Sequence, residues 1–208
     1  MEFLLLLVGT ATISLSGVMM PGPVFAVTVA RGRSSPWAGS LVALGHGAVE
    51  FPLMALVVWG LASFFQERPV QIAIGLAGGA MLVWMGYGLL RSRPEEGEIV
   101  GKTPRVWRAP PVLAGMTTTA SNPYFFLWWA TVGATLLSRG LAFGLPGLLA
   151  VAATHWTCDL AWDTLVSFLT FHSRRLWTPL VHRLVFGGCG LLLIGFGIYF
   201  AVSAFLGG

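Results

Sequence analysis

Long apolar stretches cover most of this 208-residue chain and restrict its possible folds more than any other feature. A helix needs about 20 apolar residues to cross the hydrocarbon core of a bilayer. Six stretches reach that length, at residues 3–30, 37–64, 70–90, 111–137, 143–170 and 184–206. Only 10% of the residues are charged, which excludes an ordinary soluble domain. The sequence predicts an all-α integral membrane protein with six transmembrane helices in a single domain, residues 1–208.

The basic residues are unevenly divided between the loops. Ten of the 12 Lys and Arg residues fall in the first, third and fifth loops, and the other two are Arg68 and Arg139. By the positive-inside rule the odd-numbered loops face the cytoplasm, and both termini are expected outside it. This distribution explains the net charge of +4 without a nucleic-acid partner. We expect a multi-pass protein of the inner or plasma membrane, in contact with lipid. No Lys or Arg precedes the first apolar stretch, so we expect a retained span rather than a signal peptide.

A pair of polar residues recurs in the second half of the chain. His46 and Glu50 are each followed, 109 residues later, by His155 and Asp159. Charged groups are costly inside apolar stretches, so residues of this kind usually have a function. The recurrence indicates that the chain is a duplicated membrane unit with one such pair in each half.

The predicted repeats contain three spans each. Because three is an odd number, the second repeat crosses the membrane in the opposite direction to the first. We expect repeat one at residues 1–91, a cytoplasmic loop at 92–110 and repeat two at 111–208. Inverted repeats of this kind are typical of secondary transporters, whose substrate site lies between the repeats near the bilayer midplane.

Proline interrupts the first span of each predicted repeat, within Met20-Pro21-Gly22-Pro23 and within Ser121-Asn122-Pro123. Proline lacks an N–H group and stops or kinks a helix. Both sequences also resemble helix starts, because Gly or Asn is favoured as the cap and proline at the first helical position. The N-terminus of a restarted helix favours an anion such as a carboxylate. A simple kink would explain one break, but two in corresponding places favour a substrate site. The predicted substrate-binding residues here are Pro21, Gly22, Pro23, Asn122, Pro123 and Tyr124.

Residues four apart share one face of a helix, so each histidine lies beside its acid. We expect Glu50 and Asp159 to approach each other near the midplane, with His46 and His155 alongside. The two acids are predicted to bind a substrate ammonium group or exchange a proton for it, and all four residues to take part in proton coupling. At least one acid should be protonated near neutral pH. Two alternatives remain open: hydrogen bonds between helices, and a divalent metal site formed by the same four residues.

Other features add little chemistry. Asp163 extends the second polar face by one turn, or lies nearer the interface. Cys158 and Cys189 form no CxxC motif and are expected to be small buried side chains. One or two of the deeper tryptophans are candidates to line a cavity, and these are Trp128, Trp129, Trp156 and Trp162. The sequence contains no nucleophile elbow, phosphate loop or metalloprotease motif, so we expect neither an enzyme nor a cofactor.

Taken together, these motifs resemble the LysE/RhtB family of amino-acid exporters. The resemblance rests on Met20 to Pro23, Gly45 to Glu50, Asn122-Pro123 and His155 to Trp162, and it covers essentially the whole chain. It implies a six-span, proton-driven exporter of amino acids or related small metabolites that often forms a homodimer. The family commonly follows Asn-Pro with Lys, and this chain has Tyr124 at that position. More distant relatives move metal cations, which matches the metal alternative.

Overall fold

The computed structural model describes residues 1–20, 22–61, 64, 67–91, 109–176 and 178–206, which form helices and contain no strand. In chain order the elements are α1 (Glu2–Val18), α2 (Pro23–Gly32), α3 (Ala38–Leu56), η1 (Val57–Leu61), α5 (Arg68–Leu90), α7 (Pro111–Ala120), α8 (Pro123–Trp128), η2 (Trp129–Gly133), α9 (Ala134–Leu141), α10 (Gly144–His172), η3 (Ser173–Leu176) and α11 (Pro179–Leu206). The predicted all-α class is confirmed for the described residues.

Three continuous helices of the described part are long and apolar enough to cross a membrane. They are Ala38–Gly60, Arg68–Leu90 and Pro179–Ser203. Helix α10 is longer still, with 29 residues, but it carries the buried Asp159 and Asp163. The remaining two predicted spans are each divided into shorter helices, and α1 contains the apolar segment Glu2–Leu15. The helices therefore follow the six apolar stretches of the sequence.

Both predicted helix breaks are present. Helix α1 ends at Val18 and α2 begins at Pro23, with Gly22 as an extended N-cap at φ −137°. Helix α7 ends at Ala120 and α8 begins at Pro123, where Asn122 Oδ1 accepts a hydrogen bond from the Tyr124 N–H at 3.1 Å. Proline at the first helical position explains why each helix restarts at that residue. Two predicted features, Pro21 and residues 92–108 of the loop 92–110, lie outside the described residues.

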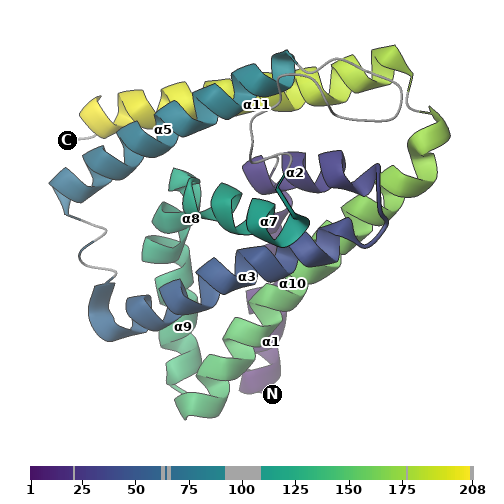
Figure 1. Ribbon diagram of the computed structural model, residues 1–208. Helices are drawn as coiled ribbons and strands as arrows, with labels where there is room; N and C mark the ends of the chain where they lie inside the picture. The colour runs from purple at the N-terminus through teal and green to yellow at the C-terminus, as the bar shows by residue number, and fades with distance from the viewer. Residues whose placement is uncertain (21, 62–63, 65–66, 92–108, 177, 207–208) are drawn as a thin grey trace.

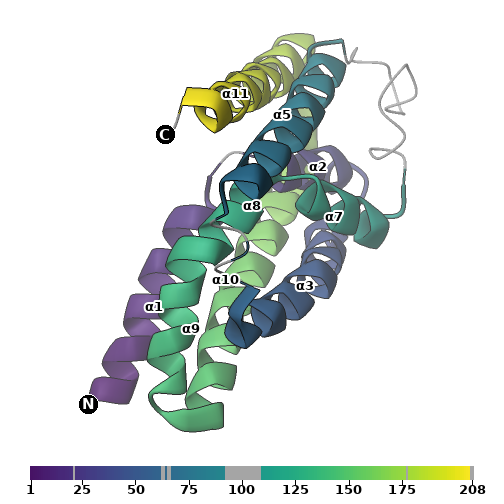
Figure 2. The same ribbon diagram turned by 90° about the vertical axis from the view of Figure 1, so that its left-hand side faces the viewer.

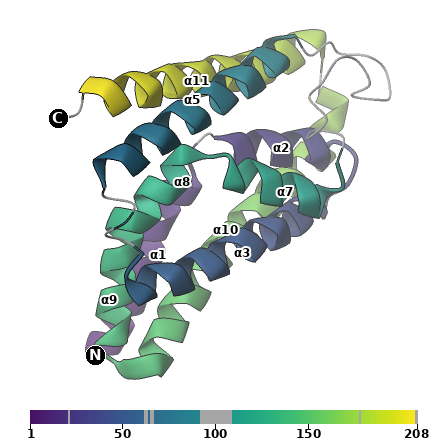
Figure 3. The same ribbon diagram turned by 60° about the vertical axis from the view of Figure 1, so that its left-hand side comes forward.

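The helices are arranged around a central group of short elements. Helices α5 and α11 run antiparallel along one side of the molecule, and α3 and α10 cross on the other (Figure 1). Helices α2, α7 and α8 lie between these two pairs, as a second view confirms (Figure 3). Helices α1 and α9 run side by side with the first part of α10 (Figure 2). The two helix breaks therefore lie inside the molecule, between the outer helix pairs.

Close backbone contacts hold α5 against α11. A Cβ atom on Gly79 would lie 2.6 Å from the carbonyl oxygen of Gly197, and one on Gly86 would lie 2.5 Å from that of Gly190. Such distances leave no room for a side chain, so the two helices pack backbone to backbone. Small residues of this kind are what membrane helices use to approach closely, because lipid provides no hydrophobic drive between them.

Glycines also set the position of α3 between α7 and α10. A Cβ atom on Gly45 would lie 1.9 Å from the carbonyl oxygen of Val112 in α7. One on Gly39 would lie 1.8 Å from the carbonyl oxygen of Asp163 in α10. The polar faces of α3 and α10 are consequently brought close enough for their side chains to meet.

Candidate functional site

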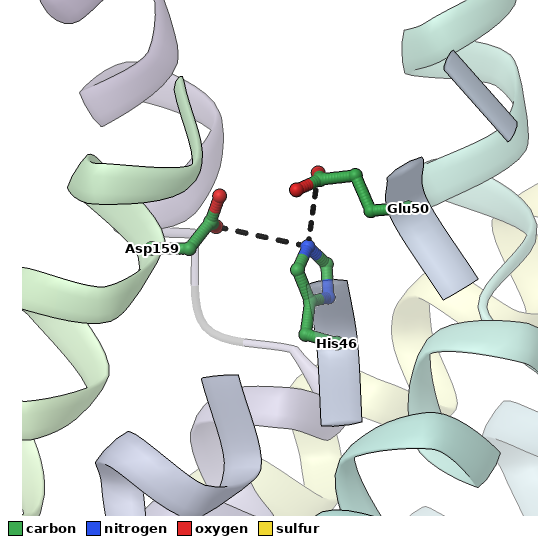
Figure 4. Close-up of side chains that lie close together, drawn as sticks. All are labelled: His46, Glu50 and Asp159. Atoms are coloured by element: carbon green, nitrogen blue, oxygen red, sulfur yellow. Dashed lines mark hydrogen bonds and ion pairs between the residues drawn. The ribbon is translucent and has the colours of Figure 1, made fainter. Parts of the chain in front are cut away.

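The four residues of the two predicted His–acid pairs lie together in one buried cluster. His46 and Glu50 come from α3, and His155 and Asp159 come from α10. Exposure of these residues to solvent is low, at 8% for His46, 0% for Glu50, 4% for His155 and 6% for Asp159. His46 lies between the two acids, within reach of both (Figure 4). The expected approach of the two pairs is therefore observed.

Glu50 receives three N–H groups at one oxygen. Its Oε1 atom lies 3.1 Å from His46 Nε2, 3.1 Å from His155 Nε2 and 3.2 Å from Trp129 Nε1. An indole nitrogen can only donate, and an ionised carboxylate can only accept. The other oxygen, Oε2, is buried and makes no hydrogen bond to the described residues. Glu50 is thus held by one oxygen and leaves the other unsatisfied.

Asp159 has a looser environment. Its Oδ1 atom lies 3.8 Å from His46 Nε2, and Oδ2 lies 3.4 Å from His155 Nε2. Oδ2 makes no hydrogen bond to the described residues, although it is buried. A buried carboxylate oxygen without a donor is costly, so it indicates a place for a proton, an ammonium group or a metal ion.

Each histidine is also held at its second ring nitrogen. His46 Nδ1 lies 2.8 Å from Thr119 Oγ1 in α7, and His155 Nδ1 lies 2.7 Å from Ser14 Oγ in α1. Both hydroxyl groups are buried. Each histidine therefore contacts the first part of the broken helix in the opposite half of the chain. Ser14 and Thr119 could not be identified from the sequence, because no fixed spacing relates them to the breaks or the histidines.

Asp163 belongs to the same polar face, one helical turn beyond Asp159. Its Oδ1 atom accepts a hydrogen bond from Thr28 Oγ1 of α2 at 3.1 Å. The residue is only 4% exposed and lines the same cavity as the four clustered residues. Of the two positions considered from the sequence, the structure therefore places Asp163 on the extended polar face rather than at an exposed edge.

One cavity joins the polar cluster to both helix breaks. The volume of this cavity, counted as the space open to the centres of water molecules, is about 100 Å³. One water needs roughly 10–15 Å³ by this measure, so several waters or a small solute fit. The lining includes Gly22, Pro23, Asn122, Tyr124, His46, Glu50, His155, Asp159 and Asp163. Pro123 is buried next to this group, and Trp129 is one of the tryptophans on the wall.

The cluster also has the chemistry of a metal site. One ligand atom each from His46, Glu50 and Asp159 lies within 4.8 Å of the others. Imidazole and carboxylate groups are competent ligands for divalent metals. The hydroxyl partners at Nδ1 resemble the outer contacts that orient metal-binding histidines. Cys158 and Cys189 are unpaired and only partly buried, so they are less enclosed than expected and lie outside this cluster.

Comparison with known proteins gives a consistent result. The family model for the LysE type translocator matches residues 15–204. The chain is 32% identical to the chemotactic transduction protein ChpE of Pseudomonas aeruginosa, covering 84% of this chain and 87% of that protein. It is 27% identical to the threonine efflux protein of Escherichia coli K12, covering 96% and 99% of the two chains.

A putative amino acid efflux protein, YcgF of Bacillus subtilis, is 24% identical over 86% of this chain and 87% of its own length. No solved structure gives a significant match. The family match spans nearly the whole chain, including both helix breaks and both His–acid pairs. The chain therefore belongs to the LysE type translocator family, and it is a membrane transport protein rather than an enzyme.

Proposed function

We propose that this protein is a secondary active exporter of amino acids or related small metabolites, coupled to the proton gradient. The observation that carries the proposal is the cavity, where both helix breaks and both His–acid pairs meet. The relatives named as threonine and amino acid efflux proteins support the substrate class. Matched broken helices around a buried polar site are the arrangement expected of transporters with internal repeats.

The carboxylate of the substrate binds at the start of α2. This helix begins at Pro23 after Gly22, and glycine at the N-cap has no side chain with which to cap the first turn. The N–H groups of that turn and the positive end of the helix dipole suit an anion. The corresponding start of α8 is already capped by Asn122, whose Oδ1 accepts from the Tyr124 N–H. Asn122 and Tyr124 therefore line another part of the cavity wall, Pro123 begins the helix that carries Tyr124, and α2 provides the stronger anion site.

The ammonium group of the substrate binds at Asp159. This residue lines the cavity and keeps one buried oxygen without a hydrogen bond to the described residues, so an ammonium donor there satisfies a group that is otherwise costly to bury. A proton at the same carboxylate has a similar effect, and the two cations exchange. Each histidine contacts both acids. The proton therefore passes through the cluster by way of the histidines and Glu50.

Alternating access results from movement of two inverted repeats, residues 1–91 and 111–208, about this cavity. Support comes from the reciprocal contacts of His46 with α7 and His155 with α1, which a two-fold relation between the repeats would produce. The loop charges support a topology with both termini outside the cytoplasm. Impermeant thiol labelling of a cysteine introduced at residue 2 tests this topology in a variant lacking Cys158 and Cys189. Labelling only from the cytoplasmic side contradicts it.

A transport assay tests the function itself. Purified protein in proteoliposomes should move amino acids against their gradient when a pH gradient is imposed, and a proton-conducting ionophore should abolish that movement. Uphill transport that survives the ionophore contradicts proton coupling. Failure to exchange any amino acid under these conditions contradicts the substrate class.

Export of a divalent cation is the second candidate function, favoured by the grouping of His46, Glu50 and Asp159. For a metal exporter, His46→Ala and His155→Ala should reduce transport as much as Glu50→Gln and Asp159→Asn do. Asn122→Ala should then matter little, because its capping bond does not touch the cluster. Assaying Zn²⁺ and Mn²⁺ beside amino acids in the same proteoliposomes separates the two functions. Equal tolerance of all five substitutions would mean that the cluster is structural.

A further inference from the structure

The walls of the cavity differ sharply in chemistry. The carboxylates Glu50, Asp159 and Asp163 all come from α3 and α10. The other side, formed by α5, α8 and α11, contributes Leu82, Tyr124, Leu193, Phe196 and Phe200. Helices α5 and α11 lie on the opposite side of the molecule from α3 and α10, with α8 between the two pairs (Figures 1 and 3). Side chains from both groups of helices line the same cavity.

The apolar wall is a continuous packed surface. The ring centroids of Tyr124 and Phe200 are 6.3 Å apart, and those of Phe196 and Phe200 are 6.5 Å apart. Leu82 and Leu193 complete it and are each only 1% exposed. The close glycine contacts between α5 and α11 fix the backbone that carries four of these side chains. The wall therefore has a defined shape to which a ligand group can be matched.

We propose that the transported amino acid carries an uncharged, apolar side chain, of the size of leucine or phenylalanine. The inference rests on the proposed function, because the carboxylate at α2 and the ammonium group at Asp159 orient the side chain toward Tyr124, Phe196 and Phe200. Burial of an apolar side chain against this wall is favourable in proportion to the area removed from water. Tyr124, Phe196 and Phe200 are the specificity-determining residues.

Other side chains fit this cavity less well. No Lys or Arg is among the described residues that line it, so an acidic side chain meets three carboxylates, and the two histidines on the wall already contact Glu50. A basic side chain has to place its charge on the aromatic wall, where cation–π attraction offsets only part of the desolvation cost. A threonine side chain is smaller and covers less of the wall.

The test is a competition assay with the full chain in proteoliposomes. Liposomes preloaded with unlabelled L-leucine or L-threonine are given the same amino acid in labelled form, and exchange is inhibited with L-phenylalanine, L-leucine, L-threonine, L-lysine or L-glutamate. Leucine and phenylalanine should inhibit at concentrations roughly tenfold lower than threonine, as two or more additional buried carbons imply.

The outcomes separate the two proposals. Threonine, lysine or glutamate inhibiting as well as leucine, with exchange intact, overturns this inference and leaves the proposed function standing. Absence of exchange with every amino acid overturns both. The wild-type panel requires no variant, so it decides the question even where a substitution prevents folding.

A matched pair of variants tests the wall itself. Phe200→Ala should reduce the preference for leucine over threonine roughly tenfold while threonine exchange persists, a pattern that misfolding does not produce. Ile198→Ala, on the same helix but 53% exposed, should leave the preference unchanged. An unchanged preference in Phe200→Ala with threonine exchange retained contradicts the role of this wall.

Discussion

Glu50 and Asp159 hold equivalent places in the two halves of the sequence but have unequal surroundings. Glu50 is fully enclosed and takes N–H groups from His46, His155 and Trp129 at one oxygen. Each acid has one buried oxygen without a hydrogen bond to the described residues, but Asp159 is also 3.4 Å or more from either histidine. The difference indicates that Glu50 organises the cluster, while Asp159 is available to a cation that comes and goes.

Trp129 contributes to this asymmetry, beside the shorter histidine contacts of Glu50. It lies in η2, the sixth residue after Pro123, and donates its indole N–H to Glu50. The sixth residue after Pro23 is Val29, which has no side-chain donor to offer. The second acid of the pair therefore lacks the contact that fixes the first. Two acids at corresponding places in the sequence can in this way have different surroundings.

The largest expected effect is the loss of transport when either acid is replaced by its neutral amide. Asp159→Asn removes the exchangeable charge, so uphill export should be lost and the apparent affinity in exchange assays should fall roughly tenfold or more. Glu50→Gln should also abolish uphill export, but its amide oxygen can still accept from the three donors, so exchange affinity should remain near wild type. Both variants are measured in the same proteoliposome preparation. Equal losses of exchange affinity would break the distinction between the acids.

Truncation of the same two residues to alanine should lower stability more at Glu50 than at Asp159. Glu50→Ala leaves His46, His155 and Trp129 without their shared acceptor and should cost about 3–5 kcal/mol. Asp159→Ala removes no hydrogen bond to a described side chain and should cost clearly less, on the order of 1 kcal/mol. Thermal unfolding in detergent compares them. A larger loss for Asp159→Ala would show that the roles are assigned the wrong way round.

The hydroxyl partners of the histidines offer a smaller and symmetric test. Thr119→Ala and Ser14→Ala each remove one contact to a histidine Nδ1 and should each lower stability by about 1 kcal/mol. Thr117→Ala is the control, because Thr117 is exposed and bonds to the carbonyl of its own helix. Similar losses for the first two variants support an equivalent role in the two halves. If Ser14→Ala leaves stability unchanged, the two histidines also differ in how firmly they are held.

Loss of the α8 cap should have the smallest effect. Asn122→Ala removes the acceptor for the Tyr124 N–H and should cost roughly 1 kcal/mol or less. Substrate affinity should weaken a few-fold, because Tyr124 lies on the cavity wall in the first turn of α8. Ser121→Ala, one residue earlier, controls for general disturbance of the break. Affinity loss as large as that of Asp159→Asn would indicate that the substrate carboxylate binds at α8 instead of α2.

Much of the architecture could be predicted from local features of the sequence. Apolar stretches identified the helices, because their length and composition alone decide whether they suit a membrane. Gly22-Pro23 and Asn122-Pro123 identified both restarts, since the preference of proline for the first helical position does not depend on distant contacts. The spacing of four residues placed each histidine beside its acid on one helix face.

Only the tertiary structure decided how these local features are used. The contacts of Glu50 with His155 and Trp129, and of the histidines with Ser14 and Thr119, join helices that are far apart in the chain. They depend on how closely the helices pack, which Gly39 and Gly45 permit, and on which face each helix presents there. Helical periodicity fixes neighbours within one helix, but partners across helices follow from packing geometry. For this reason the sequence showed two equivalent acids, and the fold made them different.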